Sequence, residues 1–126
     1  MSSVRYGTVR LIAIALILSG HVGAQANLAI ASEAKQFTLI NVIFDGTKVW
    51  LPTHMILQEG DEVELTLINK LDDPHGFQIA AFGIETVVQP KAKTTVRFTA
   101  SQAGLYPFIC HLHPPHLGGQ ILVLGK

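Results

Sequence analysis

The segment FICHLHPPHLGGQ places the only cysteine of the chain, Cys110, directly before three of its six histidines, His111, His113 and His116. A thiolate combined with imidazoles is a ligand set for copper, zinc or iron. The usual zinc patterns bring paired cysteines or a helix with two histidines, and neither is present in this sequence. Attachment of a c-type haem is excluded because it needs a second cysteine. The segment therefore predicts a metal site that combines one sulfur with imidazole nitrogens.

The first 26 residues are typical of an export signal. Arg5 and Arg10 precede the apolar run 11–18, and small residues end in Ala24-Gln25-Ala26. The apolar run is shorter than the roughly 18 residues that a membrane-spanning helix needs. We therefore expect a bacterial-type signal peptide over residues 1–26, a periplasmic protein, and no stable membrane insertion after cleavage. An uncleaved signal that acts as a tether remains the alternative.

Composition narrows the class of the remaining chain, residues 27–126. Removing Arg5 and Arg10 from nine basic residues leaves seven, against nine acidic residues, so the net charge is −2. Binding to a nucleic-acid backbone depends on clustered Lys and Arg, which are absent here, so nucleic acid is excluded as a partner. A lone cysteine makes no internal disulfide, and an idle thiol is a liability in an oxidising compartment. We infer that Cys110 has a chemical function.

Short extended segments predict an all-β fold. We expect residues 27–35 to form a flexible lead-in and residues 36–126 to form one domain. The clearest strand is GDEVELTLINK, in which Val63, Leu65 and Leu67 alternate with polar residues. Gly and Pro separate the other short runs, and after the signal no segment keeps the apolar spacing of an amphipathic helix over three turns. These features favour a β-sandwich.

From about residue 36 to the end, the chain resembles a cupredoxin, the small copper-binding sandwich. The resemblance lies in GDEVELTLIN followed by DDPHGFQI, and in AGLYPFICHLH further along the chain. It implies a cupredoxin-like Greek-key β-sandwich that holds one copper ion, Cu+ or Cu2+, in a type 1-like site. It also implies that His75, Cys110 and His113 are the equatorial metal ligands.

The fourth metal ligand departs from the usual cupredoxin pattern. Its place is usually taken by a methionine, and no methionine follows Cys110. In the short, amicyanin-like ligand loops of the family, the spacing places this ligand at His116. The resemblance therefore implies His116 in place of the axial methionine. Because an imidazole binds divalent copper more strongly than a thioether, this exchange is expected to lower the reduction potential.

Two residues next to the predicted ligands carry further expectations. Gly76 stands where many relatives have an asparagine that helps to hold the cysteine loop, so the residues around the ligands lose one support. His111 directly follows Cys110, and adjacent side chains of an extended chain point apart. We therefore expect His111 on the surface or as a hydrogen-bond donor, and not as a ligand.

The predicted function is that of an exported mononuclear copper protein that carries single electrons. We expect no enzyme activity, because four protein ligands leave no open coordination position for a substrate. Two alternatives stay open: a periplasmic copper carrier or storage protein, and a nitrosocyanin-like copper site that reacts with a small molecule. Zinc with the same four ligands also stays open.

The surroundings of the ligand loop predict a docking surface. Four apolar residues lie close to the ligands in sequence: Leu112, Pro114, Pro115 and Leu117. An uncharged patch of this kind suits weak docking of a redox partner protein. We expect the protein to be a monomer.

Overall fold

The computed structural model of the protein describes residues 33–113 and 116–126. The predicted signal peptide and most of the predicted lead-in lie outside the described residues. Within the described part, the regular secondary structure consists of nine strands and one short 3-10 helix, η1 (Ala80–Phe82), joined by turns and loops. The prediction of an all-β sandwich is confirmed. None of the helical structure in the described residues has the length and apolar character needed to cross a membrane.

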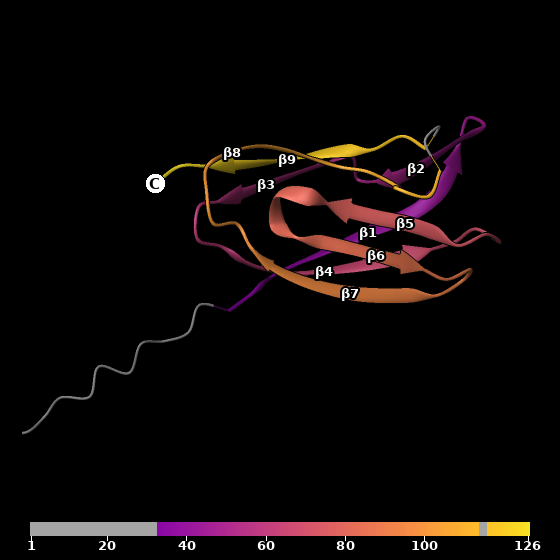
Figure 1. The fold of residues 1–126 in the computed structure, drawn as a ribbon, viewed down its shortest axis with the longest axis horizontal. Helices are drawn as coiled ribbons and strands as arrows, with labels where there is room; N and C mark the ends of the chain where they lie inside the picture. Colours follow the sequence, from indigo (N-terminus) through magenta and orange to yellow (C-terminus); the bar gives the residue numbers. More distant parts are fainter. Residues whose placement is uncertain (1–32, 114–115) are drawn as a thin grey trace, which may run out of the picture.

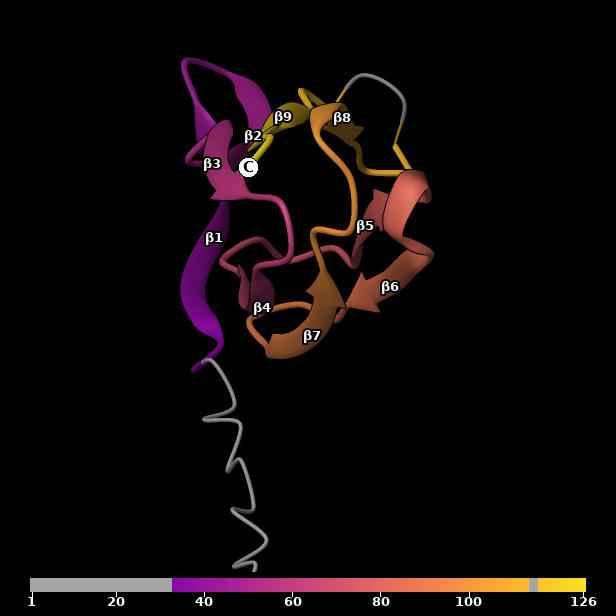
Figure 2. The same ribbon diagram turned by 90° about the vertical axis from the view of Figure 1, so that its left-hand side faces the viewer.

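The strands form three sheets that surround a common interior, as Figures 1 and 2 show in two perpendicular views. The largest sheet has the order β2 (Thr47–Leu51), β1 (Lys35–Phe44), β4 (Glu62–Asn69) and β7 (Lys93–Thr99). The second has the order β3 (His54–Gln58), β9 (Gly119–Leu124) and β8 (Gly104–Phe108). The third pairs β5 (His75–Ile79) with β6 (Ile84–Val88). Adjacent strands run parallel in two cases, β1 with β4 in the first sheet and β3 with β9 in the second. The other pairs of adjacent strands are antiparallel.

Local sequence explains the clearest elements. Strand β4 buries Val63, Leu65 and Leu67 on one face, because side chains two residues apart point to the same side of a strand. The turn between β1 and β2 is formed by Asp45 and Gly46, which both have positive φ angles, of 47° and 73°. This is the backbone that a tight two-residue hairpin needs, and Asp-Gly is a favoured pair for it.

Aromatic residues fill the interior beneath the predicted metal site. Trp50, Phe77 and Phe108 are completely buried. The Phe77 ring meets the Trp50 ring edge to face, with centroids 5.6 Å apart, and its centroid lies 5.3 Å from that of Phe108. Rings at such separations attract each other in addition to burying apolar area. They give the ligand-bearing segments a rigid base.

Candidate metal centre

The predicted ligands lie on two segments that the fold brings side by side. His75 is the first residue of β5, and Cys110 follows β8. The two segments are joined by backbone hydrogen bonds in both directions between Gln78 and Ile109, with N···O distances of 2.9 and 3.0 Å. Because this pairing is antiparallel, the residues that follow Ile109 lie opposite the residues that precede Gln78, toward the beginning of β5. A histidine 35 positions earlier in the chain thereby reaches the cysteine.

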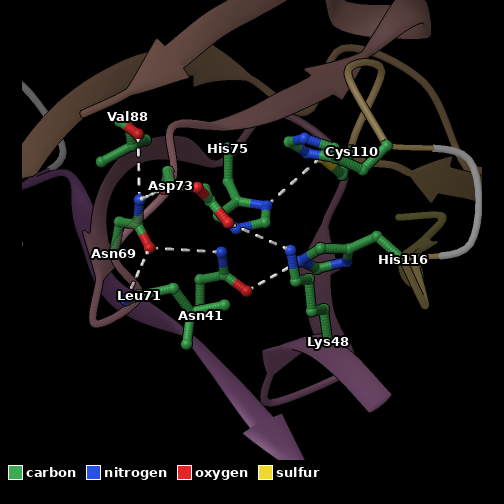
Figure 3. A network of polar contacts seen from close by, with 10 residues as sticks. Asn41, Lys48, Asn69, Leu71, Asp73, His75, Val88, Cys110 and His116 are labelled. Atoms are coloured by element: carbon green, nitrogen blue, oxygen red, sulfur yellow. Dashed lines mark hydrogen bonds and ion pairs between the residues drawn. The ribbon is translucent and has the colours of Figure 1, made fainter. Parts of the chain in front are cut away.

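Three ligand atoms gather at this end of the sandwich. The Cys110 sulfur lies 3.9 Å from Nδ1 of His75 and 3.8 Å from Nδ1 of His113. All three atoms lie within 4.8 Å of one another. Figure 3 shows His75 and Cys110 pointing toward each other across the site. The structure thus brings together three of the four residues that the sequence predicts as ligands.

The spacing of these atoms fits a metal ion between them. A first-row ion binds sulfur at about 2.3 Å and imidazole nitrogen at about 2.0 Å, which at an angle of about 120° separates the sulfur and nitrogen by about 3.7 Å. The observed separations of 3.9 and 3.8 Å are close to this value. Cys110 is free of disulfides and almost wholly buried, so a soft sulfur ligand faces one fully buried and one partly buried imidazole.

His75 is the most enclosed of the three residues. Its side chain is completely buried, and its second nitrogen, Nε2, has no hydrogen-bond partner. Burial lowers the pKa of His75 from 6.5 to about 4, and the neighbouring His116, His113 and Lys48 add to the decrease, while Asp73 opposes it. A neutral imidazole is the form that binds a metal, so the surroundings favour the ligating state.

His116 lies beside this cluster and has other partners. Its ring centroid is 5.2 Å from that of His75. However, Nε2 is 2.7 Å from Oδ1 of Asn41, and Nδ1 is 3.0 Å from the carbonyl oxygen of Leu117. Burial lowers the pKa of His116. Of the four predicted ligands, His116 is the one whose nitrogens do not join the group of close ligand atoms, and its role as fourth ligand stays a prediction.

His111 occupies the place that Gly76 leaves open. A side-chain carbon added to Gly76 would come within 2.6 Å of Nδ1 of His111, so the imidazole packs directly on this glycine. His111 is partly buried, and its Nδ1 is buried without a hydrogen-bond partner. The Gly76 carbonyl accepts a hydrogen bond from Nε1 of Trp50 at 3.2 Å. The cysteine loop is therefore supported by packing of His111 on Gly76, the position whose lack of a side chain was expected to remove a support.

Two asparagines form a polar network that the sequence analysis missed. Asn41 on β1 and Asn69 on β4 are both completely buried and are partners in the parallel register. Figure 3 shows them linked to each other and to His116. A signal was present: Asn41 follows Leu39 on the inward face of its strand, and Asn69 follows Leu67 in the same way. A polar residue on an otherwise apolar face normally has a buried partner.

A cavity of about 380 Å³ opens beside the cluster. Its lining consists of Gly46, Thr47, Lys48, His113 and His116. Lys48 also lies 3.5 Å from the Asp73 carboxylate, and its side chain is about one-third exposed. The side of the site that carries His113 and His116 is therefore open to small solutes.

The fold and the cluster together define the class of the protein. A β-sandwich with one buried thiol and two imidazoles at one end has the architecture of cupredoxins and the donor set of a type 1-like copper site. The chain belongs to the cupredoxin-like domain family, which it matches over residues 10–123. The resemblance stated from the sequence is confirmed. The family implies copper as the metal.

Comparison with individual proteins leads to copper enzymes. A copper-containing nitrite reductase of Cereibacter sphaeroides is 39% identical over 64 residues, which cover 44% of this chain and 17% of that protein. A copper nitrite reductase from Nitrosomonas europaea superposes with a TM-score of 0.65 and 22% identity, over 75% of this chain and 42% of that one. A copper-containing nitrite reductase from Thermus scotoductus superposes with a TM-score of 0.60 and 25% identity, over 74% of this chain and 28% of that one. This chain spans less than half the length of each.

The prediction that the protein has no enzyme activity is contradicted by these relatives, which are named as reductases. The prediction relied on four ligands closing the coordination sphere. Among the described residues, the close group of ligand atoms contains three, and a cavity adjoins it. The closed set of four ligands, on which the exclusion of a substrate relied, is therefore not found among the described residues.

Proposed function

We propose that this domain binds one copper ion through His75, Cys110 and His113 and transfers single electrons through it. The supporting observation is the convergence of one thiol and two imidazole nitrogens within 4.8 Å, on segments held by backbone hydrogen bonds. Copper in such a site alternates between the monovalent and divalent states. The protein's part is to hold a soft sulfur and two nitrogens in an arrangement that suits both states, so that little reorganisation accompanies electron transfer.

The exposed rim of the site supports weak docking of a redox partner. His113 is the partly exposed member of the cluster, so its ring connects the site to the surface. Leu112 and Leu117, on either side of it in sequence, have exposed fractions of 42% and 56%. Apolar residues around an exposed ligand edge suit brief contacts, in which little charged surface has to be desolvated. Pro114 and Pro115 lie outside the described residues.

The test of the copper proposal is the visible spectrum of the protein loaded with Cu2+. We expect an intense sulfur-to-copper charge-transfer band in the wild type and its loss in Cys110→Ser, with His54→Gln as a control for an exposed histidine outside the site. Elemental analysis of protein purified without added metal decides between copper and zinc. Absence of the band in copper-loaded wild type would refute the proposal.

A second candidate function is favoured by the cavity beside the cluster. Lys48 adds a positive charge and Thr47 a hydroxyl to a lining that also contains His113 and His116. Such a lining suits a small anion, and the relatives' names point to nitrite. An anion in this cavity would compete with His116 for the fourth coordination position.

Titration with azide and with nitrite tests this candidate. A spectral change that is weakened in Lys48→Gln and unchanged in Lys93→Gln, on a strand without cavity-lining residues, supports it. Consumption of nitrite by the reduced protein would then show turnover. A charge-transfer band that is insensitive to both anions would leave electron transfer as the function and remove the second candidate.

The cellular setting is proposed from the leader sequence. Arg5, Arg10 and the following apolar run support export to the periplasm with cleavage after Ala26. Amino-terminal sequencing of the protein recovered from periplasmic extracts tests both points. Light scattering of the purified protein tests the proposed monomer.

A further inference from the structure

Asn69 is held in one orientation by the backbone around it. Its Nδ2 lies 2.7 Å from the carbonyl oxygen of Asp73, 3.1 Å from that of Val88 and 3.2 Å from that of Gln89. Its Oδ1 accepts a hydrogen bond from the backbone N–H of Leu71 at 3.0 Å. Reversing the amide would place its oxygen against three carbonyl oxygens and its NH2 group against an N–H. The oxygen of Asn69 is therefore fixed on the side that faces Leu71 and Asn41.

Asn41 takes its orientation from Asn69. Its Nδ2 donates to Oδ1 of Asn69 at 3.4 Å, and the two residues are register partners in neighbouring strands. Because the partner atom is an oxygen, Asn41 must present its NH2 group there. Its own Oδ1 consequently points the other way, to Nε2 of His116 at 2.7 Å, as Figure 3 shows. Asn69 thus determines which atom of Asn41 faces His116 in the ligand loop.

His116 then has its ring proton placed by this chain of contacts. Both ring nitrogens face oxygens, Oδ1 of Asn41 at 2.7 Å and the Leu117 carbonyl at 3.0 Å, and a neutral imidazole has one N–H. The closer oxygen belongs to Asn41, which favours the tautomer with the proton on Nε2. Nδ1 is left with a lone pair against a carbonyl oxygen, a contact that offers no hydrogen bond. His75 and His113 also direct Nδ1 toward the Cys110 sulfur.

We propose that Asn69 and Asn41 select the Nε2–H tautomer of His116 and thereby keep its Nδ1 available as the fourth copper ligand. Asn41 is then a positioning residue: it contacts the predicted ligand and not the metal. The proposal has two halves. The tautomer half states that His116 carries its proton on Nε2, and it concerns the metal-free protein. The coordination half states that Nδ1 of His116 is the fourth copper ligand, and it rests on the proposed copper site. Coordination would replace the unfavourable contact between Nδ1 of His116 and the carbonyl oxygen of Leu117 by a bond to copper. Copper binding therefore favours movement of the His116 ring away from this carbonyl.

Nitrogen NMR of the full chain, metal-free and labelled with 15N-histidine, tests the tautomer directly. Long-range proton–nitrogen spectra distinguish the protonated ring nitrogen from the unprotonated one. We expect Nε2–H at His116 in the wild type. In Asn41→Leu the Leu117 carbonyl is the remaining acceptor, so the tautomer ratio is expected to shift toward Nδ1–H by about tenfold, the value of one hydrogen bond. Asn41→Asp retains an oxygen and is expected to retain Nε2–H.

Controls and outcomes separate this proposal from the copper proposal. Thr38→Val, on the exposed face of the same strand, is expected to change nothing. An Nδ1–H tautomer in the wild type, or an unchanged ratio in Asn41→Leu, overturns the tautomer half. If Asn41→Leu does not fold, the wild type and Asn41→Asp decide it.

In the Cu2+ form, Asn41→Leu is expected to change the electron paramagnetic resonance spectrum and to raise the reduction potential, because an imidazole ligand is lost. Identical spectra and potentials in a correctly loaded pair overturn the coordination half. A wild type without the charge-transfer band refutes the proposed function, and the tautomer result stands separately.

Discussion

Lowering the pH of the metal-free protein is expected to reduce its folding stability through His75. The pKa of this buried imidazole is lowered from 6.5 to about 4, first by burial and then by neighbouring positive charges. The unfolded chain keeps the ordinary value near 6.5. Between pH 6.5 and about 4 the unfolded state therefore binds a proton that the folded state does not, so the free energy of unfolding increases with pH in this window. The contribution is complete above it and is lost as the pH falls.

The size of the loss follows from the two pKa values. At about 1.4 kcal/mol for each pH unit, the interval from 6.5 to about 4 corresponds to about 3 kcal/mol. This is a large part of the 5–15 kcal/mol that is typical of a small domain. Below about pH 4 the folded state is protonated as well, and the loss from His75 stops increasing. Burial of His116 lowers its pKa and adds a loss of the same sign.

Urea unfolding followed by the fluorescence of Trp50, the only tryptophan, measures this loss in the metal-free protein between about pH 7 and pH 4. His75→Gln removes the titrating ring and is expected to flatten the pH dependence of the unfolding free energy by about 3 kcal/mol over this range. His54→Gln, an exposed histidine on β3, controls for the loss of an imidazole elsewhere. Parallel pH profiles of wild type and His75→Gln would refute the reasoning.

Two glycine positions give further predictions, both measured by denaturant unfolding. Gly76→Ala places a carbon 2.6 Å from the His111 ring and is expected to cost about 1–3 kcal/mol. In a His111→Ala background the same change is expected to cost little, and equal costs in both backgrounds would contradict the packing. Gly119→Ala places a carbon 2.2 Å from the Phe108 ring and from a backbone oxygen. It is expected to cost at least about 3 kcal/mol, because backbone cannot move aside. Gly125→Ala, whose added carbon would be 3.6 Å from its neighbour, is the matched control and should be near neutral.

The strands were predictable where a local pattern determined them. In β4 the apolar residues alternate regularly, and the buried face is the one expected. The Asp45-Gly46 turn could be placed because few residue pairs adopt positive φ at low cost. The parallel pairings of β1 with β4 and of β3 with β9 could not be derived in this way. They join segments that are distant in sequence, and the residues of a strand do not specify which neighbour it will have.

The metal ligands were predictable to different degrees. Cys110 and His113 are close in sequence, and their residue types alone indicate a metal. His75 is 35 residues away from Cys110, and it was named only because the surrounding segment resembles a cupredoxin. The support that His111 gives to the loop was missed, because it depends on the antiparallel register that brings His111 over Gly76.

The number of metal ligands at this site cannot be derived from spacing in the sequence alone. Spacing determines which side chains can reach a point, and it placed His116 near the cluster. A nitrogen becomes a ligand only when no proton occupies it, and the position of the proton on His116 depends on two oxygens, Oδ1 of Asn41, which is 75 residues away, and the carbonyl of Leu117. If Asn41 keeps Nδ1 of His116 unprotonated as proposed, hydrogen bonds in the sandwich interior contribute to the coordination number together with the ligand loop. A change on β1 that leaves every predicted ligand intact can accordingly alter the reduction potential.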